Sequence, residues 1–277
     1  MDAAALAESL RRRLAARGLR PDPVILCNKS HSGSRLLARQ LGAAGLFLGA
    51  HRNASEDAWD WLPPTRHLVM SGFPAYAEQL AGRDPLLPGM VAAALERHLE
   101  GCPPGRRWGW KLCESGLALP VWLALFPEAQ VVHLIRDGRD VAFSDHTGPT
   151  DAFWRTVFFG RSDVTRWQGR RLDGPSYRRA PHLFNAQHWA HAVAAIRRFG
   201  EAAGPRYREL RYEELCLRPA DSLPPLLAWL GLSEGLEPAL AVPVEAAAIG
   251  KHRRRSVRKN RAIRPLIEPL QRTLGYE

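Results

Sequence analysis

Two stretches of the chain place phosphate-binding residue types at the ends of apolar runs. The first is a loop of small, hydroxyl-bearing and basic residues, Lys29, Ser30, His31, Ser32, Gly33, Ser34 and Arg35. It follows the apolar run 24–27 and precedes a helical stretch. Glycine and small hydroxyl residues let backbone N–H groups close on an anion at a helix N-terminus, where the helix dipole favours negative charge. The loop therefore predicts an anion site, although the same residues could cap the helix with no ligand bound.

The loop differs from a nucleotide-hydrolysing P-loop. That motif needs Gly-x4-Gly-Lys-Ser/Thr, whereas here Asn28 occupies the first glycine position and Ser34 and Arg35 follow Gly33. The phosphate cradle is kept, while the lysine and the magnesium-binding hydroxyl are lost. We therefore expect anion binding without a required metal.

The second stretch follows the apolar run 131–135. Arg136 comes at its end, the place where ligands of open α/β sheets collect, and Ser144 follows eight residues later, about two helical turns onward. A guanidinium fork plus a hydroxyl is a good receptor for a phosphate monoester. Alternatively, Arg136 caps the strand and pairs with Asp137 or Asp140.

Length and composition fit one large α/β domain or at most two small ones, with 277 residues, 45% of them hydrophobic. The net charge of +11 suggests an anionic ligand, an acidic polymer or an acidic surface, or simply a solvated arginine-rich surface. The four cysteines are widely spaced and are expected to be reduced thiols. No secretory signal and no apolar run of about 20 residues is present, so we expect a cytoplasmic protein with no membrane span.

Strand and helix patterns alternate along the chain. Helices are expected at 3–17, after residue 34, at 117–126, near residue 137 and at 185–199, and strands at 24–27, 108–112, 131–135 and 207–210. This alternation predicts a parallel sheet covered on both faces. The segment 145–183 reads as an irregular insertion that could form an acceptor pocket or lid, or an aromatic mini-core.

Four motifs, in order, resemble those of the sulfotransferase superfamily that uses 3′-phosphoadenosine 5′-phosphosulfate (PAPS), in its bacterial form. They are Ser32-Gly33-Ser34-Arg35-Leu36-Leu37, the stretch from Leu134 to Ser144, Leu210-Arg211-Tyr212-Glu213-Glu214-Leu215, and Ile249-Gly250-Lys251 with the basic run behind it. The resemblance covers roughly residues 23 to 260, and the Arg-to-Ser spacing is its specific part.

The resemblance implies a single domain, 1–277, with a P-loop-NTPase-like three-layer α/β/α fold and a central parallel sheet of four or five strands. It implies in-line sulfuryl transfer from PAPS to an acceptor hydroxyl or amine, with 3′-phosphoadenosine 5′-phosphate (PAP) as the product and no metal. The loop from Lys29 to Arg35 would hold the 5′-phosphosulfate. The other implied cofactor-binding residues are Arg136, Ser144, Tyr212 (at the adenine), Gly250, Lys251, His252 and Arg253.

One departure leaves the leaving-group acid open. The family usually has Lys or Arg just before Ser-Gly-Thr, and this chain has His31 there. A protonated histidine can donate to the developing charge, but it titrates near neutrality. His31, Lys29 and Lys111 are therefore all candidates. Lys111 could instead be an ordinary cation at a strand end, and Tyr212 could pack in the core.

The general base is expected in the segment 51–57, with Glu56 slightly ahead of Asp57. The distance of this segment from the loop resembles that of the carboxylate used in part of the family. The favoured alternative is a helix start with Ser55 as its cap. If neither carboxylate acts, His51 or a residue of 145–183 is the next candidate.

Two rival functions stay open. A P-loop kinase would need the missing lysine, and a non-catalytic polyanion-binding protein would not explain the ordered motifs. The acceptor is expected to be a small molecule, a glycan or a peptide, and not a nucleic acid. The sequence gives no prediction of the oligomeric state.

Overall fold

The structure is a computed structural model, and it describes residues 1–144, 166–167, 170–171 and 180–276. The insertion expected at 145–183 lies largely outside this part, so its proposed pocket or lid stays a prediction. Within the described residues, no helix is both long enough and apolar enough to cross a membrane.

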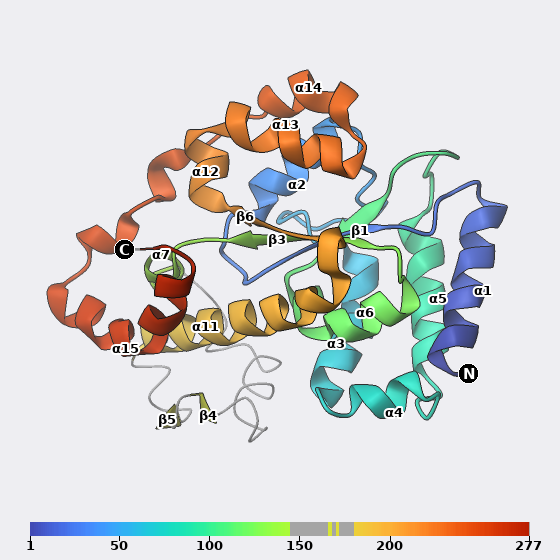
Figure 1. The fold of residues 1–277 in the computed structure, drawn as a ribbon, viewed down its shortest axis with the longest axis horizontal. Helices are drawn as coiled ribbons and strands as arrows, with labels where there is room; N and C mark the ends of the chain where they lie inside the picture. Colours follow the sequence, from blue (N-terminus) through green and yellow to red (C-terminus); the bar gives the residue numbers. More distant parts are fainter. Residues whose placement is uncertain (145–165, 168–169, 172–179, 277) are drawn as a thin grey trace.

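A parallel sheet of four strands forms the centre of the molecule (Figure 1). Its strands are β1 (Val24–Asn28), β2 (Gly109–Lys111), β3 (Gln130–Ile135) and β6 (Tyr207–Arg211), in the spatial order β2-β1-β3-β6. Ile25 of β1 lies opposite Trp110 of β2 and Val131 of β3, which fixes the register. A separate antiparallel pair joins β4 (Arg166–Trp167) to β5 (Arg170–Arg171).

Strand order reverses at β1, because the chain passes from β1 to β2 on one side and then to β3 on the other. The loops that follow β1 and β3 therefore diverge at the carboxyl ends of these strands, where open α/β folds have their ligand crevice. Open α/β sheets bind ligands at such a switch point. The two motifs found in the sequence thus lie on either side of this crevice.

Helices cover both faces of the sheet. They are α1 (Ala3–Ala16), α2 (Ser34–Ala43), α3 (Leu62–Ser71), α4 (Tyr76–Leu80), α5 (Leu87–His98), α6 (Leu119–Leu125), α7 (Gly138–Ala142), α11 (Pro181–Gly200), α12 (Tyr212–Leu217), α13 (Pro219–Leu230), α14 (Leu236–Leu240) and α15 (Val257–Thr273). Short 3₁₀ turns are η1 (Trp59–Trp61), η2 (Cys113–Ala118), η3 (Glu201–Arg206), η4 (Ser233–Gly235), η5 (Ala246–Ala248) and η6 (Lys251–Arg254). In Figure 1, α2, α12, α13 and α14 lie on one side of the sheet, and α3, α6 and α11 on the other.

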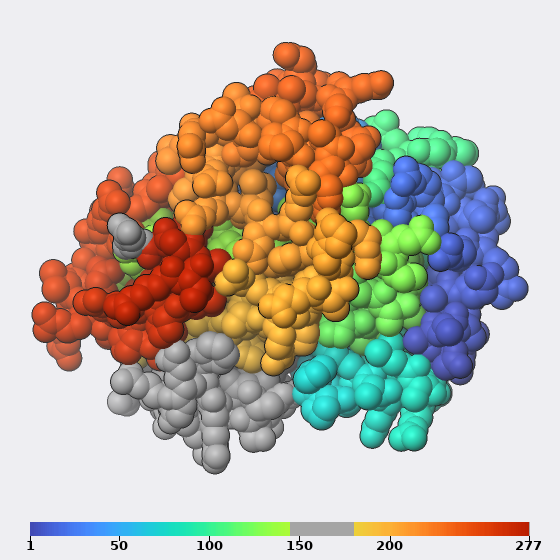
Figure 2. Space-filling view, viewed as in Figure 1, coloured from blue at the N-terminus to red at the C-terminus, as the bar shows by residue number. Residues whose placement is uncertain are grey.

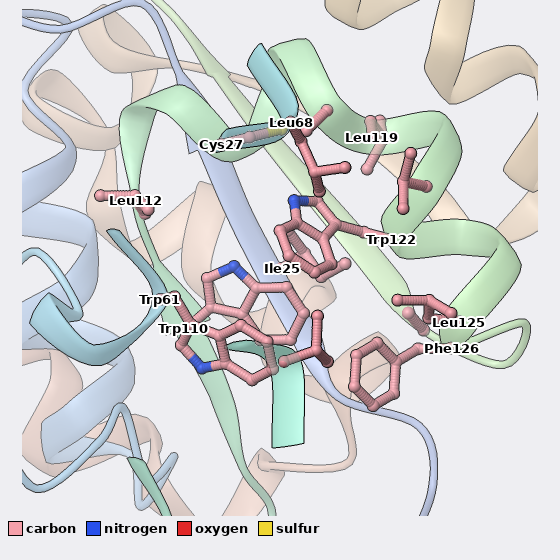
Figure 3. Close-up of a cluster of buried hydrophobic side chains, with 14 of the residues drawn as sticks. Ile25, Cys27, Trp61, Leu68, Trp110, Leu112, Leu119, Trp122, Leu125 and Phe126 are labelled. Carbon is pink, nitrogen blue, oxygen red and sulfur yellow. The ribbon is translucent and has the colours of Figure 1, made fainter. Parts of the chain in front are cut away.

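Alternation along the strands supplies the two cores. Val24 and Leu26 of β1 point toward α2 and α13, while Ile25 and Cys27 point to the opposite face. The second core is rich in tryptophan, and the rings of Trp61 and Trp110 stack with centroids 4.5 Å apart (Figure 3). Burying such large rings against one face of a short sheet holds the strand ends, and the loops that leave them, in fixed positions.

The expected three-layer α/β/α fold with a parallel sheet is confirmed. Strands are found at all four expected places, and the helix expected at 3–17 forms α1, with Leu6, Leu10 and Leu14 buried. The helix start expected at Ser55 is wrong. The side chain of Asn53 accepts hydrogen bonds from the backbone N–H groups of Ser55 and Asp57, which makes a turn, and η1 begins only at Trp59.

Candidate active site

The loop after β1 forms a tight turn that delivers the chain to the N-terminus of α2. The Lys29 carbonyl accepts from the Ser32 N–H at 3.1 Å and from the Ser32 hydroxyl at 2.6 Å. Gly33 has a φ of 86°, and a Cβ there would come within 2.1 Å of the Tyr212 ring, so only glycine fits. No described side chain caps α2. Its first-turn N–H groups are therefore oriented for an anion.

Lys29 is a buried cation inside this loop. Its side-chain Nζ donates to the Ser30 carbonyl at 2.9 Å and the Ser30 hydroxyl at 3.1 Å. Burial lowers the pKa of Lys29 from 10.5 to about 7. An anion placed nearby would favour the charged form of this ammonium group.

Arg136 leaves the end of β3 and reaches across the crevice. It is 4% exposed, and it donates to the His31 carbonyl at 3.3 Å and to the Ala248 carbonyl. Its guanidinium carbon lies 4.7 Å from the centre of the Tyr212 ring, a cation–π arrangement. The Arg136 side chain thus joins the β1 loop to the C-terminal part of the chain.

Asp140 anchors the C-terminal loop to this arginine. Its carboxylate accepts from the backbone N–H groups of Gly250 and His252 at 2.7 and 3.0 Å, and one oxygen lies 3.5 Å from Arg136. The His252 ring contacts it at 2.7 Å. Burial alone would raise the pKa of Asp140, but these hydrogen bonds and the charge of Arg136 bring it below its ordinary value.

Ser144 completes this cluster from just beyond α7. The helix ends at Ala142, so Ser144 is not carried two turns along a helix as the spacing suggested. Its hydroxyl donates to the Asp140 carbonyl at 3.2 Å and accepts from the Lys251 ammonium group at 2.8 Å. Asp140 thus holds Arg136 through its carboxylate and Ser144 through its backbone carbonyl, and Lys251 joins the cluster through Ser144. Asp137, the other suggested partner of Arg136, pairs with Arg139 instead.

A phosphate group fits this cluster on two observations. The Nε atom of Arg136 is buried and has no hydrogen-bond partner among the described residues. Such an orphaned charged donor is expensive unless a ligand satisfies it. The cluster also gathers two cations and a hydroxyl at the crevice. Tyr212 is 5% exposed and packs on Gly33 and Arg136, so its observed contribution is to shape this wall.

A second polar group lies at the ends of β1 and β2. The Lys111 ammonium group donates to Asp57 Oδ1 at 2.7 Å and to the Ser55 carbonyl at 3.0 Å. Burial works to lower the pKa of Lys111, but the neighbouring Cys113 and Asp57 raise it above its ordinary value. Asn53 holds the other oxygen of Asp57 at 3.2 Å. The Asp57 carboxylate is therefore held in a fixed orientation.

Glu56 and His51 are held elsewhere. The Glu56 carboxylate contacts Arg39 at 3.3 Å and Arg52 at 2.7 Å, one arginine on each oxygen. The His51 ring contacts Asp60 at 3.0 Å. Of the three candidates for a base in 51–57, only Asp57 contacts Lys111.

The structure adds Cys113 and Glu114 to this edge, and sequence reasoning missed both. They follow β2 directly, in η2, and that position after Lys111 was the available signal. Burial raises the pKa of Cys113 to about 12, so it is a thiol and not a nucleophile. Burial also raises the pKa of Glu114, whose nearest described partner is Arg66 at 3.5 Å.

No group of three or more histidine, cysteine or acidic side chains in the described part of the chain is arranged to hold a metal ion. All four cysteines are unpaired, as expected. What the site offers is an anion-binding helix N-terminus, a buried arginine cluster, and a lysine–carboxylate pair.

Comparison with known proteins identifies the family. The profile of a sulfotransferase family matches residues 23–236, which include both motifs and all four strands of the sheet. The chain belongs to the sulfotransferase family. It is accordingly an enzyme of the transferase class. No curated protein matches it.

Solved structures agree on the sulfotransferase fold. The sulfotransferase domain of the Synechococcus PCC 7002 olefin synthase superposes with a TM-score of 0.52 at 18% identity, over 92% of this chain and 96% of that domain. Sulfotransferase STF9 from Mycobacterium avium gives a TM-score of 0.54 at 13% identity, over 98% of this chain and 82% of that one. At such identities the likeness extends to the fold alone.

Proposed function

We propose that this sulfotransferase takes its sulfuryl group from PAPS and transfers it to a hydroxyl or amine of an acceptor, leaving PAP. The observation that carries the proposal is the buried, unpartnered Nε of Arg136 beside Ser144 and Lys251. A donor with a 3′-phosphate needs such a receptor, whereas ATP has no group to place there. The acceptor would be a small molecule, a glycan or a peptide.

The two ends of the donor would be held by different parts of the crevice. The N–H groups and side chains from Lys29 to Arg35 would hold the 5′-phosphosulfate, and Arg136, Ser144 and the loop from Gly250 to Arg253 would hold the 3′-phosphate. Tyr212 would bound the adenine side. When bound, PAPS supplies an activated sulfuryl group.

Asp57 is the base that the geometry favours. In the proposed transfer the acceptor oxygen or nitrogen forms a bond to sulfur, the bond from sulfur to the phosphate oxygen breaks, and the acceptor proton passes to a carboxylate. The Lys111 ammonium group orients Asp57 through the contact at 2.7 Å. Glu56, with an arginine on each oxygen, would only hold the loop.

His31 is the cation that we assign to the leaving phosphate. Its side chain is exposed on the loop, and its carbonyl accepts from Arg136. The ammonium groups of Lys29 and Lys111 are instead buried and bonded to protein oxygens. A positively charged imidazole can stabilise the negative charge that develops as PAP departs.

A calorimetric titration with PAP, run beside Mg-ATP, tests the proposal. We expect PAP to bind and ATP to bind far more weakly, because Ser34 stands where a P-loop kinase has its lysine. Tighter binding of Mg-ATP than of PAP would favour the kinase alternative. A cytoplasmic location is also proposed, and the four unpaired cysteines support it.

A further inference from the structure

The positive charge of the chain is concentrated near its C-terminus. Residues 251–272 contain one acid, Glu268, and nine basic residues: Lys251, Arg253, Arg254, Arg255, Arg258, Lys259, Arg261, Arg264 and Arg272. Nine positive charges against one negative charge give this stretch +8 of the chain's total of +11. This stretch lies beyond residue 236, where the family match ends.

Six of these side chains form what we call the basic surface: Arg253, Arg254, Arg255, Arg258, Lys259 and Arg261. All six are exposed, and none makes an ion pair with another described residue. Several surface arginines elsewhere are paired, as Arg11 is with Glu128 and Arg97 with Asp60. Crowding like charges without counter-charges destabilises a fold, so the basic surface is expected to serve an anionic partner.

A single nucleotide does not explain the basic surface. In this stretch it is Lys251 that contacts the proposed phosphate cluster, through Ser144 at 2.8 Å. Helix α15 alone is 17 residues, or about 25 Å long, and it carries three cations of the surface beyond that contact. The partner must therefore be larger than the donor.

A groove runs along α15 beside the basic surface. It has a volume of about 820 Å³, with Ile263, Ile267 and Tyr276 among its lining residues and Arg261 and Arg264 also contributing. Val257, which begins α15 and also lines the groove, is an apolar side chain that is 75% exposed. Ile263 and Ile267 are each only 1% exposed, so the apolar surface that the groove offers a partner comes from Val257 and part of Tyr276, next to the positive charge.

The packing of α15 argues against a membrane as the partner. A helix that lies on a membrane buries its apolar face in the lipid. The apolar face of α15 is already covered, because Ile263, Leu266 and Ile267 pack in one core with Trp189 and Val193 of α11. A purely polar polyanion has no apolar groups to place in the groove.

We propose that the basic surface and the α15 groove dock an acidic segment of a protein partner, which inserts apolar side chains into the groove. Carboxylates of the partner would face the arginines and lysines from 253 to 261. This mode combines charge complementarity with helix-in-groove recognition. The inference does not depend on which donor or acceptor the enzyme uses.

The test uses a labelled acidic peptide of about 18 residues, with Leu at helical spacing and Glu elsewhere. The full chain is titrated into this peptide at an ionic strength of about 0.15 M, and binding is followed by fluorescence anisotropy. We expect the triple variant Arg258→Glu, Lys259→Glu and Arg261→Glu to bind it at least about tenfold more weakly. Val257→Ser should weaken this peptide several-fold and leave an all-polar peptide of equal charge unaffected.

The matched control is the triple variant Arg12→Glu, Arg83→Glu and Arg106→Glu, which changes net charge equally. These residues lie in α1 or follow α4 and α5, at the end of the molecule opposite α15 (Figures 1 and 2). We expect this control to bind the peptide with an affinity within about twofold of wild type, because distant charges are screened by salt. Thermal unfolding confirms that each variant is folded. If the triple variant does not fold, Val257→Ser still tests the proposal, because it changes only an exposed side chain.

Three results would overturn the proposal. Equal binding of the all-polar peptide would mean attraction of charge without docking. Equal weakening by the control variant would mean an effect of net charge alone. Preference for vesicles of phosphatidylglycerol over the peptide would identify the partner as a membrane.

Discussion

The two ends of the proposed site are built differently. At the phosphate end, Arg136, Asp140 and Ser144 come from one stretch of nine residues, and the chain adds Gly250 and the loop behind it through backbone hydrogen bonds. At the transfer end, Lys111 meets Asp57 from 54 residues away along the chain. The first end is a local motif closed by a loop, while the second exists only because the fold brings distant residues together.

This difference predicts which end of the site should tolerate substitutions better. At the phosphate end, Arg136, Ser144 and Lys251 share one task, and we expect the buried Arg136 to contribute most, so a loss at Ser144 or Lys251 should be tolerated better than a loss at Arg136. The transfer end gives each group a separate task, so removing one of them stops the reaction. Substitutions at the two ends should therefore affect binding and turnover separately.

The largest expected effect is on turnover, from Asp57→Asn. If Asp57 takes the acceptor proton, the amide cannot, and turnover should fall about 10²–10⁴-fold. PAP affinity should change little because the phosphate cluster is untouched. Steady-state rates with titration of PAP measure both quantities. A larger loss of turnover in Glu114→Gln than in Asp57→Asn would transfer the role to Glu114.

Arg136→Ala should have the next largest effect, on binding. Removing a buried charged contact to a phosphate should cost about 2–5 kcal/mol of PAP binding free energy. Arg136→Lys should recover only part of this, because an ammonium group replaces neither the planar fork nor the stacking on Tyr212. Calorimetry of the three proteins provides the comparison. Full recovery in the lysine variant would show that the site needs only a point charge.

The sequence predicts the phosphate end of the site better than the transfer end. The strands, the order of the motifs and the placing of Arg136 and Ser144 in one cluster are encoded by local patterns: apolar runs, glycine and an eight-residue spacing. The Lys111–Asp57 pair is set by tertiary packing. The residues of the segment 51–57 show no local pattern that predicts it. Asn53, by accepting from the N–H groups of Ser55 and Asp57, turned an expected helix start into a loop.

A smaller effect is expected in the pH dependence of turnover. If a protonated imidazole at His31 assists the departure of PAP, turnover falls when that proton is lost. Lys29, with a pKa of about 7, would lose its own proton near neutral pH. Both therefore predict lower turnover at alkaline pH, by up to about tenfold per pH unit. Our assignment predicts that His31→Lys removes this limb. If His31→Ala keeps normal turnover and Lys29→Met removes the limb, Lys29 is the acid.

The smallest effect should come from Glu56→Gln. Its pairs with Arg39 and Arg52 lie at the surface, where such contacts contribute about 0–1 kcal/mol. We expect a loss of unfolding free energy within that range and turnover within about threefold of wild type. Urea unfolding and steady-state rates measure the two. A loss of turnover as large as that of Asp57→Asn would return the base to Glu56.

The central claim is that Arg136, Ser144 and Lys251 read a 3′-phosphate, and a titration that changes only that group tests it most directly. The wild-type protein is titrated calorimetrically with PAP and with AMP, which lacks the 3′-phosphate. We expect PAP to bind more tightly by about the 2–5 kcal/mol assigned to the buried contact, and Arg136→Ala to remove most of the difference. Equal affinity of the wild-type protein for PAP and AMP would contradict the account.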